Sequence, residues 1–137
     1  MQINPYLNFP GNCAEAFALY AKLFGGTIEM EMTHGGSPMA NQVPAEWHHK
    51  IMHIQMKTAD GFTLMGSDAP PAYYNKPQGF SVSLQMMDPA EAERVYAALM
   101  EGGVARMELQ KTSWAERFAM LTDRFGIPWI VNCTAAD

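Results

Sequence analysis

Runs of alternating apolar and polar residues recur along the chain, and turn residues separate them. In the first half they cover residues 3–9, 27–34, 49–57 and 61–68, and in the second half residues 79–87, 104–110, 116–123 and 127–133. A strand directs successive side chains to opposite faces, so a period of two predicts strands with one buried face. Each half of the chain is therefore expected to form a sheet.

Two further segments have helical periodicity and resemble each other. Residues 14–26 (AEAFALYAKLFGG) and 90–102 (AEAERVYAALMEG) are identical at seven of thirteen positions. Asn12 and Asp88 stand where N-caps belong, and glycine ends both segments, where a left-handed residue is favoured. Each helix follows the first strand of its half, so the predicted order of elements is βαβββ, repeated once.

This order predicts an α+β fold built from two βαβββ units, about residues 1–68 and 79–134. The length suits one core, so we expect residues 1–137 to form a single domain. A strand that crosses through a helix before a hairpin forms one sheet with its helix outside. We expect the two sheets to curl around a shared cleft.

Charge, hydropathy and cysteine content indicate which partners the protein is not expected to bind and in which compartment it is expected. Nine basic and fourteen acidic side chains give a net charge of −5. The positive charges are scattered, which argues against a nucleic-acid partner. No apolar run is long enough for a membrane span, and the N-terminus lacks the pattern of a signal peptide. Cys13 and Cys133 lie at opposite ends of the sequence, so we expect reduced thiols in a cytoplasmic protein.

Three stretches resemble the PhnB-like family of the vicinal oxygen chelate (glyoxalase/bleomycin-resistance) superfamily. They are residues 5–20 (PYLNFPGNCAEAFALY), IMHIQM with GFTLMGSDAPP, and residues 112–132 (TSWAERFAMLTDRFGIPWIVN). The resemblance implies the fold of that superfamily, a small-molecule ligand and a homodimer. Some members carry a ubiquinone-pathway methyltransferase label. This sequence has no glycine-rich strand-to-helix turn to hold S-adenosylmethionine, so that activity is unsupported.

The resemblance to glyoxalase-type enzymes implies His or Glu metal ligands on the first and fourth strand of each unit. The fourth-strand position lies four residues after the turn glycine, which is Met65 after Gly61 and Ile130 after Gly126. Neither side chain binds a hard divalent ion. We therefore expect no metal and no other cofactor. A displaced ligand set of His49, His53 and Asp68 is the alternative.

Polar side chains are expected to line the cleft, because the apolar row of each strand should face its helix. This surface suits a small polar organic ligand. The expected ligand-binding residues are Tyr6, Asn8, Gln55, Met65, Ser67, Asp68, Ser83, Gln85, Trp114 and Asn132. Two of them have an alternative role: Asp68 as the cap of the loop that follows, and Trp114 as part of a subunit interface.

His53 is the candidate for acid/base catalysis, because the unperturbed pKa of imidazole lies nearest neutrality. A half-buried histidine bonded to a neighbouring strand is the structural alternative. Asp123-Arg124 is expected to form a turn, not a catalytic pair, with Trp129 in the core. Three functions remain open. They are an enzyme without a metal that acts on a small oxygenated compound, a protein that sequesters its ligand without turnover, and a metal-dependent glyoxalase- or dioxygenase-type enzyme with displaced ligands.

Overall fold

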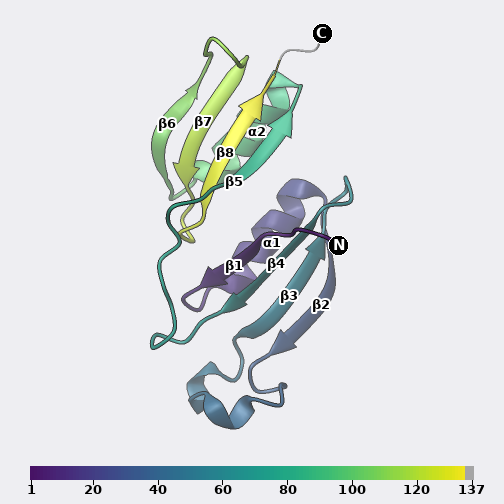
Figure 1. Ribbon diagram of the computed structural model, residues 1–137, viewed down its shortest axis with the longest axis vertical. Coiled ribbons are helices and arrows are strands. Elements are labelled where there is room, and N and C mark those ends of the chain that lie inside the picture. The colour runs from purple at the N-terminus through teal and green to yellow at the C-terminus, as the bar shows by residue number, and fades with distance from the viewer. Residues whose placement is uncertain (135–137) are drawn as a thin grey trace. The chain divides into compact units, whose positions relative to one another are not determined.

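The computed structural model describes residues 1–134, which fold into two compact units divided after Asn75 (Figure 1). The first unit runs from Met1 to Asn75, and the second begins at Lys76. Each contains one four-stranded sheet and one longer helix. The predicted α+β fold of two βαβββ units is confirmed. None of the helices within residues 1–134 is both long and apolar enough to cross a membrane.

The first unit contains four strands and the helix α1. The elements are β1 (Tyr6–Phe9), α1 (Cys13–Phe24), β2 (Thr27–Thr33), β3 (Ile51–Lys57) and β4 (Thr63–Asp68). The strand order is β1-β4-β3-β2, with β1 parallel to β4 and the other neighbours antiparallel. Two single-turn helices, η1 (Ala40–Gln42) and η2 (Ala45–Trp47), lie in the connection between β2 and β3.

The second unit repeats this arrangement. Its elements are β5 (Val82–Met86), α2 (Pro89–Met100), β6 (Val104–Gln110), β7 (Arg117–Thr122) and β8 (Pro128–Cys133). The strand order is β5-β8-β7-β6, again with the first and last strands of the unit parallel. The shared order follows from the connections: the helical crossover leads from β5 to β6 at the far edge of the sheet, and two hairpins return the chain to β8, which pairs with β5 in parallel.

Each helix covers one face of its own sheet. The buried residues of α1 recur at intervals of three or four positions, as do those of α2, so a single stripe of each helix faces its sheet. They are Cys13, Ala16, Phe17, Tyr20 and Leu23 in α1, and Ala92, Val95 and Leu99 in α2. The sheets supply the opposing apolar rows, and the core of each unit lies between its helix and its sheet.

The two helices begin in different ways. The Asp88 carboxylate accepts a hydrogen bond from the backbone N–H of Ala90 at 3.0 Å, which confirms the predicted N-cap of α2. Asn12 occupies the corresponding position before α1 but makes no side-chain cap bond. Gly25 ends α1 with a φ of 60°, a left-handed conformation in which glycine has no Cβ penalty.

Asp123 forms the corner between β7 and β8, as the sequence pattern predicted. It is 4% exposed, and its Oδ1 accepts hydrogen bonds from the backbone N–H groups of Phe125 and Ile127 at 2.9 and 3.0 Å. The indole Nε1 of the buried Trp129 donates to Oδ2 at 2.8 Å. Arg124 lies over the Phe125 ring, 4.4 Å from its centroid. This aspartate holds a tight turn and a core tryptophan together.

Candidate functional site

The helix-free face of the first sheet carries the polar row that the strand pattern predicted. Tyr6 on β1 is paired with Met65 on β4, Met65 with Gln55 on β3, and Gln55 with Met30 on β2. Alternate residues of β4 are fully buried against α1, whereas Met65 and its neighbours on the other face are partly exposed. One cross-strand row of four side chains therefore runs over the whole width of the sheet.

Tyr6 and His53 form a side-chain pair on this face. The Tyr6 hydroxyl lies 3.0 Å from Nδ1 of His53, and the two rings are stacked with centroids 5.6 Å apart. Tyr6 is 44% exposed, and His53 is partly exposed. Among the residues that the structure describes, Tyr6 is the hydrogen-bond partner of the His53 side chain, and the contact is made at Nδ1 and not at Nε2. The pair is the candidate catalytic group of the first unit.

Asn8 and Ser67 stand beside this pair at the next position along the parallel strands β1 and β4. The Ser67 hydroxyl donates a hydrogen bond to Oδ1 of Asn8 at 3.2 Å. Their bond is exposed. The structure thus brings together six of the predicted residues on one face of one sheet. They are Tyr6, Asn8, His53, Gln55, Met65 and Ser67.

Asp68 does not join this face. It is 2% exposed and continues the buried row of β4. Its Oδ1 accepts a hydrogen bond from the backbone N–H of Cys13, and its Oδ2 accepts one from that of Ile51, both at 2.9 Å. His34 Nε2 donates to its carbonyl oxygen at 2.8 Å. Both carboxylate oxygens are therefore committed to tying the start of α1 to the start of β3.

The side chains present do not fit the metal site of glyoxalase-type relatives. Met65 and Ile130 occupy the expected ligand positions on β4 and β8, and neither offers an oxygen or nitrogen donor. The displaced set is not brought together either, because His49 precedes β3 and the Asp68 carboxylate faces the backbone amides of the core. Among residues 1–134, no three His, Cys, Asp or Glu side chains gather where they could hold a metal ion.

The helix-free face of the second sheet carries the remaining predicted residues on its strands. Asn132 on β8 is paired with Gln85 on β5, and its Nδ2 donates to Oε1 of Gln85 at 2.9 Å. Gln85 Nε2 donates in turn to the Ser83 hydroxyl at 3.4 Å. Ile130 is paired with Ser83. The predicted residues Ser83, Gln85 and Asn132 are thus joined in one chain of hydrogen bonds.

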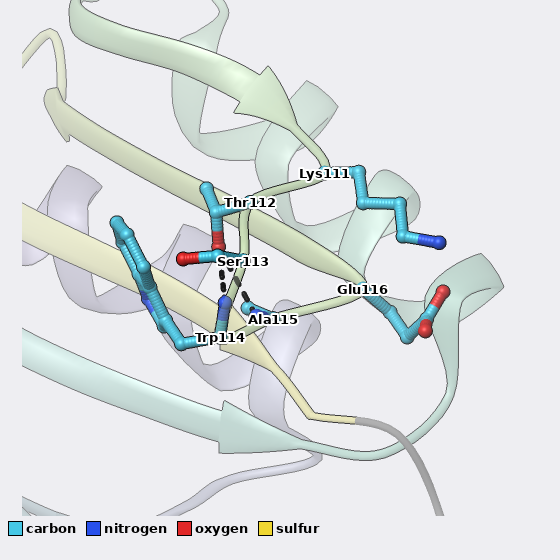
Figure 2. Close-up of a pocket in the computed structure, with 6 residues that line it drawn as sticks. All are labelled: Lys111, Thr112, Ser113, Trp114, Ala115 and Glu116. Atoms are coloured by element: carbon cyan, nitrogen blue, oxygen red, sulfur yellow. Dashed lines mark hydrogen bonds between the residues drawn. The ribbon is translucent and has the colours of Figure 1, made fainter.

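Trp114 lies in the connection between β6 and β7. Its indole is 59% exposed and meets the ring of Phe118 edge to face, with centroids 5.3 Å apart. A hollow of about 180 Å³ lies along residues 111–116 of this connection. Figure 2 shows the Trp114 ring on one side of the connection and the charged ends of Lys111 and Glu116 on the other. The Thr112 hydroxyl shapes the turn by accepting hydrogen bonds from the Trp114 and Ala115 amides.

Sequence reasoning missed Phe118. It is paired with Asn132 across β7 and β8, which places both side chains on the same face of the sheet. The signal was available, since Phe118 alternates with the buried Ala119 and shares its parity with Met120. A large aromatic side chain in a strand is usually predicted to lie in the core, so Phe118 was not considered as a residue of the helix-free face.

Both thiols are buried and free within the described structure. Burial raises the pKa of the Cys13 thiol, and the nearby Asp68 carboxylate raises it further. Burial is also the main reason that the pKa of Cys133 is raised, with Asp88 adding to it. A thiol is a nucleophile in its ionised form, so neither cysteine is suited to catalysis near neutral pH.

Sequence and structure comparisons place the chain among known proteins. It is 33% identical over 140 residues to protein YjdN of Escherichia coli, covering 96% of this chain and 95% of that protein. It is 48% identical to protein PA1353 of Pseudomonas aeruginosa, whose structure matches with a TM-score of 0.89 over 99% of both chains.

Two structures from Bacillus cereus show the same fold at lower identity. A PhnB protein matches with a TM-score of 0.82 at 19% identity, covering 98% of this chain and 100% of the other. A possible glyoxalase matches with a TM-score of 0.62 at 21% identity, covering 97% and 99%. The model of the family described as 3-demethylubiquinone-9 3-methyltransferase matches residues 1–132. The chain therefore belongs to this PhnB-like family and has its glyoxalase-like fold.

Proposed function

We propose that this protein binds a small oxygenated organic compound on the helix-free faces of its sheets and acts on it without a metal, using His53 as the acid/base group. The observation that carries the proposal is the Tyr6–His53 contact of 3.0 Å. It joins two residues that are 47 positions apart in the sequence, on a face that is otherwise lined by amides, a hydroxyl and methionine. Such a mixture suits a polar organic ligand.

The Tyr6 contact can prepare His53 for either direction of proton transfer. When the Tyr6 hydroxyl donates to Nδ1, the imidazole carries its proton on Nε2 and can donate it to a ligand oxygen. When Nδ1 donates to the Tyr6 oxygen, a neutral imidazole leaves Nε2 as a base. In both cases Tyr6 fixes the orientation of the ring, so that Nε2 serves the ligand.

Ligand capture without turnover is the second candidate. The second sheet favours it, because the predicted residues on its helix-free face, Ser83, Gln85 and Asn132, offer a hydroxyl and two amides, with the half-exposed Trp114 ring nearby. Stacking and neutral hydrogen bonds hold a compound but do not transfer its protons. The two candidates are distinguished by whether His53 affects turnover or affinity.

We do not propose the methyltransferase activity in the description of the family model. The strand-to-helix turn before α1 contains one glycine, Gly11. Its carbonyl oxygen accepts a hydrogen bond from the Lys50 ammonium group at 2.7 Å. The first helical amide, that of Cys13, is bonded to the Asp68 carboxylate. This turn is therefore filled by the protein's own groups. We propose instead a protein that needs no cofactor and forms a homodimer. We place it in the cytoplasm, because thiols stay reduced there and both cysteines are free.

The test starts with a thermal-shift screen of small hydroxy, keto and carboxylic compounds, followed by product analysis for each hit. His53→Asn should abolish turnover and leave the affinity for the compound within about threefold, because Asn keeps a polar group but cannot relay protons at neutral pH. His49→Asn, outside the strand, is the matched control and should leave turnover and affinity unchanged. A His53→Asn protein that turns over normally would refute the catalytic proposal. A variant that loses affinity alone would favour ligand capture.

A further inference from the structure

The first sheet carries two methionines beside His53. Met30 and Met32 lie on β2, and their partners on β3 are Gln55 and His53. The register is unbroken from Met30 to Met32, so both side chains lie on the face that carries Gln55 and His53. Met30 is 44% exposed, and Met32 and His53 are partly exposed. Two thioethers and one imidazole are therefore accessible from the same side of the sheet.

These three side chains are close enough to meet at one point. Residues directly opposite each other in an antiparallel pair, as Met32 and His53 are, have Cβ atoms about 4.5–5.5 Å apart. Met30 is a diagonal neighbour of His53, a relation in which the separation is about 7–8 Å. Methionine is unbranched and has three rotatable bonds, so its sulfur can turn toward such a neighbour. A single ion above the two strands is within reach of all three side chains.

The contact with Tyr6 suits His53 to metal binding. The Tyr6 hydroxyl lies 3.0 Å from Nδ1 of the imidazole. When Nδ1 donates its hydrogen to the Tyr6 oxygen, Nε2 carries a lone pair and is the atom that can coordinate an ion. Histidines that bind metals usually have such a partner on the other ring nitrogen, because it fixes the tautomer and the orientation of the ring.

We propose that Met30, Met32 and His53 form a binding site for one Cu(I) ion. Thioether sulfur is a soft ligand that selects Cu(I), and imidazole also binds copper, whereas Mg²⁺, Ca²⁺ and Mn²⁺ prefer oxygen ligands. The site lies on β2 and β3. It is therefore distinct from the ligand positions of glyoxalase-type relatives on β4 and β8, where Met65 and Ile130 stand.

The second unit lacks this set of ligands at the equivalent positions. Gly25 and Gly102 end the two helices with positive φ and align the strands that follow them. With the matching alignment of β3 and β7, the positions of Met30, Met32 and His53 are occupied by Met107, Leu109 and Phe118. Leucine and phenylalanine have no donor atom for a metal. We therefore expect the Cu(I) site in the first unit alone.

Anaerobic titration of the full chain with Cu(I), in competition with the chelator bicinchoninate, measures the affinity. Met30→Leu and Met32→Leu should each weaken Cu(I) binding at least about tenfold, because each removes one of three ligands. Met107→Leu is the matched control, 36% exposed at the equivalent position of the second unit, and should leave the affinity unchanged. Absence of Cu(I) binding, or an unchanged affinity in both β2 variants, would overturn the proposal.

Methionine-methyl NMR of the unaltered protein locates the ion without any substitution. The thiols of Cys13 and Cys133 are also soft ligands, but both are buried. One equivalent of Cu(I) should shift the methyl signals of Met30 and Met32 and leave that of Met107 in place. Unchanged signals of Met30 and Met32 in the presence of bound Cu(I) would place the ion elsewhere and contradict the site.

This inference goes beyond the proposed function and shares His53 with it. A bound Cu(I) ion occupies Nε2, so it should exclude an organic compound that needs the same nitrogen. The Cu(I) titration contains no organic compound, so the two proposals can fail separately. If Cu(I) does not bind while turnover of a compound depends on His53, this inference is wrong and the proposed function stands. If Cu(I) binds as expected and no compound depends on His53, the proposed function is wrong instead.

Discussion

At the scale of single residues, each unit contains one buried aspartate whose carboxylate accepts hydrogen bonds from backbone amides and so connects separate parts of the unit. Asp68 bridges the first amide of α1 and the first amide of β3, and Asp123 bridges two amides of a turn and the Trp129 indole. Carboxylates that accept N–H bonds in the interior form stronger bonds than neutral acceptors. A carboxylate can act as a catalytic acid, but the hydrogen bonds of both residues are structural.

Replacing Asp68 with Asn should lower the free energy of unfolding by about 2–3 kcal/mol, because an amide nitrogen would face one of the two backbone donors. The measurement is urea denaturation followed by circular dichroism. Asp60→Asn, at an exposed turn, is the control and should change stability by less than about 0.5 kcal/mol. An Asp68→Asn protein as stable as the control would show that these bonds contribute nothing.

Cys13 should make stability fall at alkaline pH. Its pKa is raised in the folded protein above the ordinary value of 9.0, so the thiol is favoured by folding. The stabilisation is complete below pH 9.0 and is lost as the pH rises towards the folded pKa, because the unfolded chain ionises first. Between pH 7.5 and pH 10, Cys13→Ala should lose about 1 kcal/mol less stability than the unaltered protein. Equal losses in denaturant titrations at the two pH values would contradict this mechanism.

At the scale of elements, the two helices solve the same problem in different ways. The N-terminus of a helix leaves amide groups unpaired, and a nearby side chain usually accepts from them. In α2 that side chain is the local Asp88, whereas in α1 it is Asp68, 55 residues away from Cys13 in the sequence. The equivalent end of β8 carries Cys133, which cannot replace a carboxylate.

The consequence is a difference between two substitutions at equivalent positions. Asp88→Ala should destabilise the protein by about 1 kcal/mol, the usual cost of losing an N-cap. Asn12→Ala should cost less, because Asn12 makes no cap bond and its buried Oδ1 has no partner among the described residues. Thermal denaturation of the two variants side by side measures the difference. A larger loss in Asn12→Ala would contradict the cap assignment.

Element identities followed from the sequence because the periodic signal and the repeat agree. All eight predicted strands and both helices are present, but β1 begins at Tyr6 instead of residue 3, and β5 covers Val82–Met86 instead of residues 79–87. Ile3 is 94% exposed, so its apolar character did not indicate burial. The pattern gives the face of a strand but not its length, because length depends on the partner strand.

At the scale of the whole molecule, the sequence pattern likewise gives the face on which a site residue lies but not the residues that it contacts. Alternation correctly grouped the residues of each face, yet the Tyr6–His53 and Trp114–Phe118 contacts depend on strand register and on a connection, which have no periodicity. Asp68 shows the opposite failure. It was expected to bind the ligand, although it shares its parity with Leu64 and Gly66, which belong to the buried row. Parity was the better guide, because a buried carboxylate is stable when backbone donors surround it.

Adding Zn²⁺, Mn²⁺ or Mg²⁺ to purified protein should leave its melting temperature unchanged, because methionine and isoleucine stand where the metal ligands of glyoxalase-type relatives would be. A ligand that binds the folded state raises the melting temperature in proportion to its affinity and concentration. A rise of several degrees that a chelator reverses would show a metal site that these residues do not predict.

The proposed ligand site on the first sheet is tested most directly by methionine-methyl NMR with a compound from the screen. Met65 lies on the helix-free face between Tyr6 and Gln55, whereas Met56 is fully buried on the other face. Titration should shift the Met65 methyl signal and leave that of Met56 in place, and His53→Asn should preserve this pattern while turnover stops. A shift of Met56 with an unchanged Met65 would place the ligand elsewhere and contradict the proposed site.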